Sequence, residues 1–442
     1  MNRRDILRRT ASAGMLAAPA AAVVGNLTGT DAASGPVASV LAAGGIDLRE
    51  RGLVPGDDDA HAAGNTAVWE QATAEAAANR TGVYLPGSAV YRFTGHLHLD
   101  SGVRYVSDGA TLRLANGANR DLVRTRDFDR LWSTVSTAGP SGWSLVGFTL
   151  DGNAANQSVD CFPLSLWGRD FSIERVRVTN GRGGGIRSGN GPGGALMEAR
   201  LANVTVYNNS RLQVDFRGPN DSQLSDVIVF TDFSFHDGRA IAGSRGIAFT
   251  GNANGTQADR LHVWGFHERG IELGSTGVAV YNGVSEGAQV NVQVQASSCV
   301  FDGTVFGTAG TGPHRGREVG YRLGTAGTGV TQWNNRLRAT MHRWSAGDRP
   351  VDLVTDNGTS IDVNVLAGAA TGVVFGSRDY KTTVNVLCPD QPRFSERAGG
   401  FSGTGAPNVA LGVVGSLYTR RDGGAGSFLY RKTSAGTWTA IL

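Results

Sequence analysis

The chain has 442 residues, with 41 lysines and arginines against 38 aspartates and glutamates, which gives a formal net charge of +3. Arg3, Arg4, Arg8 and Arg9, set against Asp5, account for this whole excess, so the rest of the chain is close to neutral. Such a balance argues against binding to nucleic acid or to an anionic membrane through overall charge, and we expect neither partner.

The first 33 residues are predicted to be a signal peptide of the twin-arginine type followed by a tether. The paired Arg3 and Arg4 precede Ile6 and Leu7, and a run of small apolar residues extends from Ala11 to Val24. This run is too short and too rich in alanine to cross a membrane as a helix. We therefore expect a secreted protein without a membrane span.

Three cysteines, Cys161, Cys299 and Cys388, are too few and too widely spaced for a disulfide framework or a close-spaced metal site. We expect all three to be buried as small apolar side chains. The predicted chemistry needs no cofactor, although calcium bridging between surface carboxylates is a second possibility that the sequence leaves open.

In chain order, the first predicted element after a Gly-, Ala- and Ser-rich stretch that ends near Gly45 is a helix over 65–79, with Asn65 as its cap. Short alternating runs follow, such as Val83-Tyr-Leu-Pro-Gly and Thr111-Leu-Arg-Leu, and Gly or Asp interrupts them at close intervals. This pattern is typical of strands and turns.

Further along, a six-residue pattern of apolar positions repeats every 19 to 34 residues or so. The copies are Ile173-Glu-Arg-Val-Arg-Val, Leu201-Ala-Asn-Val-Thr-Val, Leu224-Ser-Asp-Val-Ile-Val, Ala258-Asp-Arg-Leu-His-Val and Ser360-Ile-Asp-Val-Asn-Val. Ten residues after the fourth position a second apolar strand begins in several copies, as Val176 and Ile186 show. The repeat predicts an all-β solenoid in one long domain.

The segment from Gly45-Ile-Asp-Leu through Leu97-His-Leu-Asp-Ser-Gly resembles the start of the pectin-lyase-like superfamily of right-handed parallel β-helices, which includes polygalacturonases, pectate lyases and phage tailspikes. The resemblance covers about 45–395 and implies a β-helix with an N-terminal capping helix. The polygalacturonase motifs and the calcium-binding aspartate cluster of pectate lyases are both missing from it. Residues 407–442 are similar to a small β module at the ends of phage tail proteins, which implies a role in assembly or binding and leaves a homotrimer open.

The register of the repeats predicts a column of surface residues, one from each coil. With Ile186, Val214, Ile247, Ile271 and Val290 facing inward, the next residues face outward: Arg187, Asp215, Ala248, Glu272 and Asn291. Asp215 and Glu272 would then lie roughly 9.6 Å apart at the backbone. Carboxyl groups ~6.5 to 9.5 Å apart match inverting glycoside hydrolysis, in which one protonates the glycosidic oxygen and the other activates water.

We predict Asp215, Glu272 and Glu268 as catalytic residues. The predicted substrate-binding residues are Arg187, Arg211, Gln213, Arg217, Trp264, His267 and Arg269. Arginines bind carboxylates or sulfates in a bidentate manner, and a tryptophan offers an apolar face to a sugar ring.

The leading hypothesis is a secreted glycoside hydrolase that acts on a polysaccharide. A polysaccharide lyase that uses His267 or an arginine as base on a uronic acid is the first alternative. The second is a glycan-binding β-helix without catalysis, similar to an adhesin or a tailspike.

Overall fold

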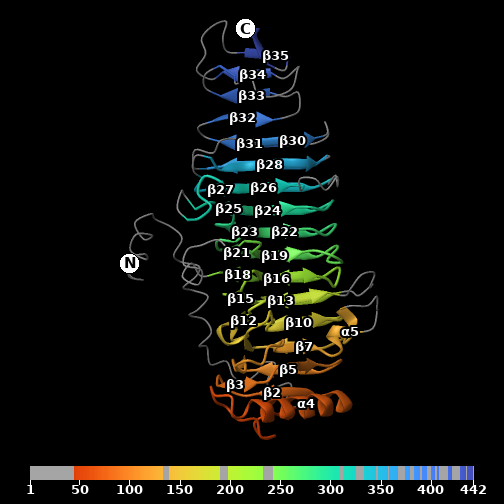
Figure 1. The fold of residues 1–442 in the computed structure, drawn as a ribbon. Helices are drawn as coiled ribbons and strands as arrows, with labels where there is room; N and C mark the ends of the chain where they lie inside the picture. Colours follow the sequence, from red (N-terminus) through yellow and green to blue (C-terminus); the bar gives the residue numbers. More distant parts are fainter. Residues whose placement is uncertain are drawn as a thin grey trace.

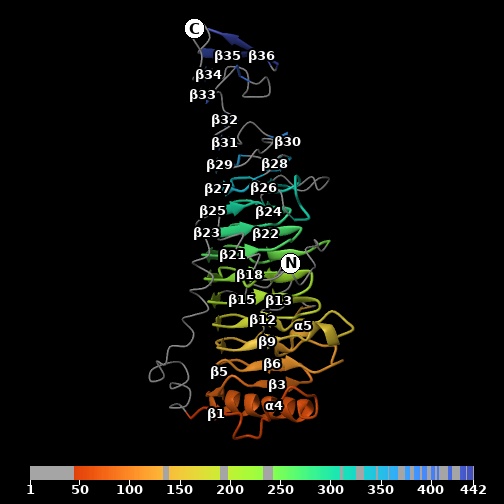
Figure 2. The same cartoon turned by 90° about the vertical axis from the view of Figure 1, so that its left-hand side faces the viewer.

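The computed structural model describes residues 44–132, 139–189, 198–231, 242–308, 312–324, 333–344, 347–356 and 358–366, with shorter segments between 374 and 441. The signal peptide and tether predicted over 1–33 lie outside these residues. The described chain is a right-handed parallel β-helix, a stack of coils that runs from helix α4 to the C-terminal strands (Figures 1 and 2). The predicted fold class is confirmed.

Eleven strands, one from each coil, form a parallel sheet that we call sheet B and that faces the viewer in Figure 1. They are β4 (Leu97–Leu99), β7 (Val123–Thr125), β10 (Leu164–Trp167), β13 (Gly184–Gly189), β16 (Leu212–Arg217), β19 (Arg245–Phe249), β22 (Arg269–Leu273), β24 (Val290–Val294), β26 (Val319–Leu323), β28 (Arg349–Asp356) and β30 (Val374–Arg378).

The larger sheet, which we call sheet A, has two faces that meet at a corner. Its first face contains β1 (Ile46–Asp47), β2 (Gly82–Leu85), β5 (Arg104–Ser107), β8 (Ser144–Val146), β11 (Phe171–Glu174), β14 (Ala199–Ala202), β17 (Gln223–Ser225) and β20 (Gln257–Asp259). The second contains β3 (Val90–Phe93), β6 (Thr111–Leu114), β9 (Thr149–Asp151), β12 (Arg177–Thr179), β15 (Thr205–Tyr207), β18 (Ile228–Phe230) and β21 (His262–Trp264). In the upper coils longer strands run across both: β23 (Ala279–Glu286), β25 (Val300–Phe306), β27 (Arg336–His342), β29 (Ser360–Val365) and β31 (Thr383–Cys388).

The corner between the two faces lies at the third residue of the repeated pattern. Arg175, Asn203, Asp226 and Arg260 all have positive φ, between 51° and 55°. Asparagine and aspartate tolerate this left-handed conformation better than most residues. The corner amides still continue the ladder, since Asn203 N–H donates to the Ser225 carbonyl at 3.0 Å. One left-handed residue therefore turns each coil without interrupting its hydrogen bonds to the next.

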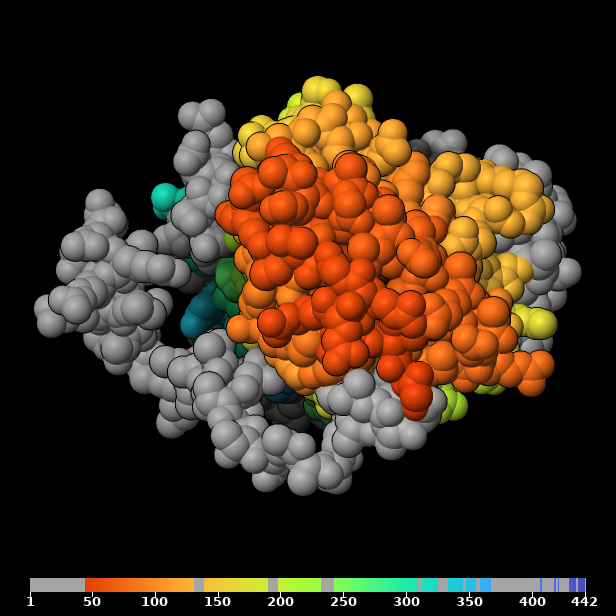
Figure 3. All heavy atoms as spheres, turned by 90° about the horizontal axis from the view of Figure 1, so that it is seen from below, coloured from red at the N-terminus to blue at the C-terminus, as the bar shows by residue number. Residues whose placement is uncertain are grey.

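Helix α4 (Ala62–Asn79) closes the lower end of the solenoid, where N-terminal residues cover the coils in Figure 3. Trp69 is fully buried and stacks on Tyr105, with ring centroids 5.4 Å apart. The helix begins three residues before the predicted start, and Asn65 is not its cap. The Asn65 amide instead lies buried and bonds to both backbone groups of Val54 and to the Arg92 carbonyl, which ties the preceding loop to the coils.

At the upper end β31 pairs antiparallel with β32 (Gln391–Ser395). A four-stranded sheet follows, made of β33 (Gly400–Gly403), β34 (Leu417–Arg420), β35 (Leu429–Ser434) and β36 (Thr437–Ala440). Two short helical segments lie on the connections: α5 (Phe128–Trp132) and the 3₁₀ turn Ala154–Asn156.

Cys161 and Cys299 are buried free thiols, as predicted, whereas the side chain of Cys388 lies outside the described residues. In the described part of the chain, no helix is both long and apolar enough to cross a membrane.

Candidate functional site

The predicted surface column exists on sheet B. In its lower coils His98, Arg124, Ser165, Arg187 and Asp215 are paired in register. The column then continues through Ala248, Glu272, Gln293, Arg322 and Asp352. We call these ten residues the B column. Its side chains point away from the core because the flanking residues, such as Val214 and Phe216, are buried in the hydrophobic core.

Asp215 and Glu272 lie two rungs apart in the B column, with Ala248 between them. Parallel strands are about 4.8 Å apart, so the two backbones are separated by roughly 9.6 Å, as predicted. Alanine on the middle rung leaves only a methyl group between the two acidic side chains.

Asp215 is only 6 % exposed, and its carboxylate accepts a hydrogen bond from Arg217 Nε at 2.8 Å. Burial raises the pKa of the Asp215 carboxyl above its usual range, while the nearby charges of Arg217, Arg245 and Arg187 act in the opposite direction. The side chain of Arg217 is half exposed, so the cation that screens Asp215 faces the solvent. Asp215 therefore takes up a proton more readily than an exposed aspartate.

Glu272 lies in an ion-pair network with two arginines. Its side chain is 3 % exposed, with Arg245 at 3.1 Å and Arg269 at 3.0 Å from separate carboxylate oxygens. Arg245 and Arg269 are themselves neighbours on adjacent strands, three residues before Ala248 and Glu272 respectively. Arg245 is not among the predicted site residues, although this shared offset is visible in the sequence.

Arg187 belongs to the B column, but its side chain already binds other residues of the protein. Its guanidinium contacts Asp121 at 2.5 Å and the Ser165 hydroxyl at 2.8 Å. It also lies over the rings of Phe128 and Phe162, 4.8 and 4.7 Å from their centroids. These contacts hold the Arg187 guanidinium in place on the strand next to Asp215.

Two predicted positions prove wrong. Asn291 is not in the B column, because Glu272 pairs with Gln293; Asn291 is fully buried and bonds to Ser285. Gln213 is also buried, at 1 % exposure, with its amide bonded to Asn209. Gln213 and its neighbour Val214 are both buried, so Gln213 is not placed to touch a substrate.

Other predicted site residues lie on the corner before sheet B and not in the column. Glu268 accepts a hydrogen bond from the Gly243 amide at 2.6 Å. His267 is buried, at 2 % exposure, 3.5 Å from the Thr231 hydroxyl. Trp264 ends β21 of sheet A and stacks on Phe230, with centroids 4.6 Å apart, and Phe230 stacks in turn on Tyr207. Arg211 directly precedes β16 of sheet B, and its side chain is exposed.

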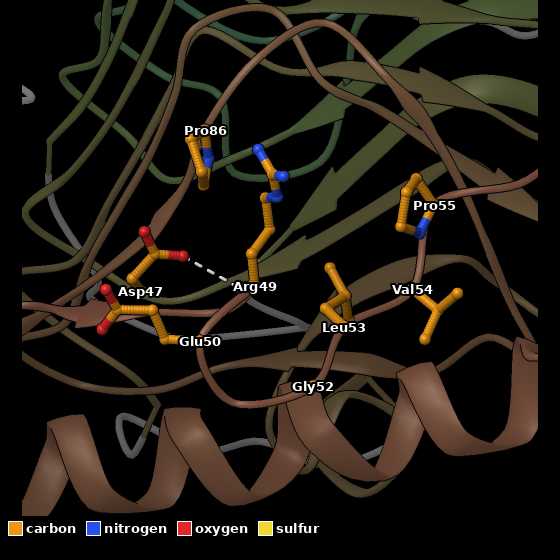
Figure 4. Close-up of a pocket in the computed structure, with 8 residues that line it drawn as sticks. All are labelled: Asp47, Arg49, Glu50, Gly52, Leu53, Val54, Pro55 and Pro86. Carbon is orange, nitrogen blue, oxygen red and sulfur yellow. Dashed lines mark hydrogen bonds between the residues drawn. The ribbon is translucent and has the colours of Figure 1, made fainter.

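Two pockets lie away from the two acids. One of about 340 Å³ opens at the lower end of the B column, where its lining includes His98, Arg124 and Arg126. Another of about 520 Å³ lies in the loop before α4, between Asp47, Arg49 and Pro86 (Figure 4). In the described part of the chain, no group of three or more His, Cys, Asp or Glu side chains is placed to hold a metal ion.

Comparison with known proteins supports the fold. No protein-family model matches the chain, and no curated protein matches it in sequence. The A-module of mannuronan C-5 epimerase AlgE4 from Azotobacter vinelandii has a similar structure, with a TM-score of 0.51 and 18% identity over 77% of this chain and 99% of that one.

Two further structures resemble the chain less closely. A surface adhesin of Streptococcus pneumoniae, PfbA, gives a TM-score of 0.45 and 12% identity over 90% of this chain and 99% of that one. The tailspike protein of Escherichia coli bacteriophage HK620, in complex with a pentasaccharide, gives 0.47 and 11% identity over 91% of each chain. All three are parallel β-helix proteins. The strand pairing of the chain and its likeness to the AlgE4 module both show a right-handed parallel β-helix.

Proposed function

We propose that this chain is an exported carbohydrate-active enzyme that binds a polysaccharide along sheet B and hydrolyses it between Asp215 and Glu272. The observation that carries the proposal is the pairing of these two acids in one outward column, two rungs apart across Ala248. The AlgE4 module, whose name assigns it an action on mannuronan, adds a relative of the same fold that acts on a polysaccharide.

The two acids take different roles because their surroundings differ. Burial favours the protonated form of Asp215, so Asp215 is the general acid. Glu272 lies in ion pairs with Arg245 and Arg269 as a carboxylate, so Glu272 is the general base. Asp215 gives its proton to the glycosidic oxygen as the bond from that oxygen to the anomeric carbon breaks. Glu272 takes a proton from water as the water oxygen bonds to the same carbon from the opposite side.

Both carboxyl groups are nearly covered, so substrate has to displace the side chains above them. Arg217 and Arg245 contact the two acids and have side chains that are 52% and 36% exposed. Substrate hydroxyl or carboxylate groups that bind these guanidinium groups would draw them off the acids. Binding and exposure of the catalytic pair would then occur together.

Specific observations favour each alternative. The arginines around the pair suit a lyase that neutralises the carboxylate of a uronic acid, although the burial of His267 leaves an arginine as the base. The near-complete burial of both acids in ion pairs suits a glycan-binding protein without catalysis.

Asp215→Asn and Glu272→Gln test the proposal on a panel of polysaccharides that includes polymannuronate, polygalacturonate and dextran. We expect the unaltered protein to release reducing ends and each variant to lose this activity while it still binds. A product with ultraviolet absorbance from a new double bond would establish the lyase. Binding without any product would establish the glycan-binding protein.

Export, calcium and assembly need separate measurements. Replacement of Arg3 and Arg4 by lysine should retain the protein in the cytoplasm if a twin-arginine signal directs export.

Activity in the presence of a chelator tests the calcium alternative. Light scattering on the purified protein tests whether it forms a homotrimer.

A further inference from the structure

We infer that the polysaccharide is acidic and that one of its carboxylate or sulfate groups opens the site by drawing Arg245 away from Glu272. This inference rests on the proposed function and adds to it a substrate class and a side chain that gates the site. Arg245 begins β19, the strand that lies between the strands of Asp215 and Glu272 in sheet B. Its guanidinium contacts Glu272, and its charge also acts on Asp215. Arg245 is therefore placed to affect both acids at once.

The two arginines that contact Glu272 are held differently. Arg269 lies on the same strand as Glu272, donates a hydrogen bond to Oε1 at 3.0 Å and has a side chain that is 25% exposed. Arg245 lies 3.1 Å from Oε2 and is 36% exposed, yet Oε2 accepts no hydrogen bond from the described part of the chain. An ion pair without a hydrogen bond is the weaker kind. Arg245 is thus the partner that can leave, while Glu272 keeps Arg269.

The exchange of Arg245 from Glu272 to the substrate requires an anionic group. Removal of a cation from a nearly buried carboxylate is unfavourable, because the attraction between the two charges is lost. A neutral hydroxyl group accepts a hydrogen bond from a guanidinium but brings no charge in place of the carboxylate. A carboxylate or sulfate group brings both the charge and two parallel acceptors. Acidic sugars therefore open the site more readily than neutral ones.

Positive charges are in excess around the two acids. The Arg245 amide donates to the Arg211 carbonyl at 2.7 Å, which places Arg211 on the neighbouring rung, and the side chains of Arg211 and Arg217 are both exposed. The four cations Arg211, Arg217, Arg245 and Arg269 face the three carboxyl groups of Asp215, Glu268 and Glu272. The excess grows when Asp215 is protonated. This part of sheet B therefore attracts an acidic sugar chain.

The departure of Arg245 also favours the proposed roles of the two acids. Arg245 is one of the cations that lower the pKa of Asp215 against the effect of burial, so its departure leaves Asp215 with a stronger hold on its proton. Glu272 stays ionised because the hydrogen bond from Arg269 remains. Binding of an acidic sugar thus prepares the acid and the base together.

The test uses pairs of polysaccharides that differ only in charge. Polygalacturonate and polymannuronate are each compared with their carboxyl-reduced forms, and dextran sulfate is compared with dextran. We expect the unaltered protein to favour the acidic member of one pair about tenfold in kcat/KM for reducing-end release, which corresponds to ~1.4 kcal/mol. The pair that shows this preference identifies the anionic group. Arg245→Ala should lose most of the preference, with a higher kcat/KM on the neutral member, and Arg245→Lys should retain it.

Arg260→Ala is the matched control, because Arg260 also contacts two carboxylates, those of Asp226 and Asp259, but on sheet A. This variant should keep the full preference. Equal kcat/KM on both members of every pair in the unaltered protein would overturn the inference and leave the proposed function intact. An unchanged preference in Arg245→Ala would overturn it as well, since other groups would then select the charge. If no pair yields reducing ends at all, the proposed function fails and the inference with it. Circular dichroism of each variant checks that the fold is retained.

Discussion

Arg245 lies on the strand between Asp215 and Glu272 and connects the two acids electrostatically. Its guanidinium contacts Glu272 at 3.1 Å, and its charge also lowers the pKa of Asp215 against the effect of burial. One cation thus acts on both acids of the B column.

Arg217→Ala should move the alkaline limb of kcat/KM to higher pH. A general acid must be protonated, so activity falls as the pH rises through the pKa of Asp215. The Arg217 cation is the main group that lowers this pKa, so its removal raises it further. The pH profile of reducing-end release measures the limb. Arg322→Ala, which removes an arginine paired with Asp352 higher in the column, is the control and should leave the limb in place. A shift to lower pH in Arg217→Ala would contradict the role of Asp215 as acid.

Arg245→Ala should reduce the free energy of unfolding by about 1–3 kcal/mol, because it takes one of two ion-pair partners from a nearly buried carboxylate. Denaturant titration measures the loss. The double variant with Glu272→Gln should lose less than Arg245→Ala alone, since glutamine carries no charge that needs a partner. Arg260→Ala, which breaks exposed ion pairs with Asp226 and Asp259, should change stability little. Equal losses in the single and double variants would show that the charge of Glu272 does not matter.

The course of the coils was largely predictable from the sequence, because apolar residues alternate and the pattern recurs. The offset of ten residues from Val204 to Val214 and from Leu261 to Ile271 gives the correct register of sheet B. The predicted register is wrong one coil later, because β24 has the sequence Val290-Asn-Val-Gln-Val. Alternation alone cannot distinguish Val290 from Val292, and the structure pairs Ile271 with Val292. A shift of two residues in the pairing of β22 with β24 keeps every apolar side chain inside, so the sequence pattern is the same for both registers.

The environment of the site was less predictable than its column. Trp264 and His267 are close to Glu272 in sequence, but the corner at Gly265, with φ of 130°, separates sheet A from sheet B. Proximity along the chain therefore does not place these side chains near Glu272. Arg245, by contrast, comes from another coil, and only stacking brings it beside Glu272.

Glu318 should make the folded state less stable as the pH rises. Burial raises the pKa of Glu318 to about 7, and Asp348 and Glu286 add to the effect, while hydrogen bonds from Thr308 oppose it. Between the ordinary value of 4.5 and about 7 the folded chain retains a proton that the unfolded chain has lost. The free energy of unfolding should therefore fall across this window.

Denaturant titrations from ~pH 4.5 to ~pH 8 measure this slope. Glu318→Gln should flatten it, because glutamine does not ionise and still accepts the hydrogen bond from the Thr308 amide. Glu50→Gln, at an exposed position near α4, is the control and should keep the slope. Identical slopes in Glu318→Gln and the unaltered protein would mean that Glu318 ionises normally.

Trp264→Ala should lower stability without any effect on polysaccharide binding. The indole is the upper ring of the stack with Phe230 and Tyr207 on sheet A, so the stack holds three coils together. Its loss should cost about 1–3 kcal/mol in the free energy of unfolding. Denaturant titration and polysaccharide binding, both measured on Trp264→Ala, check the two expectations. A binding defect in Trp264→Ala at unchanged stability would restore Trp264 as a sugar platform and place the polysaccharide on sheet A.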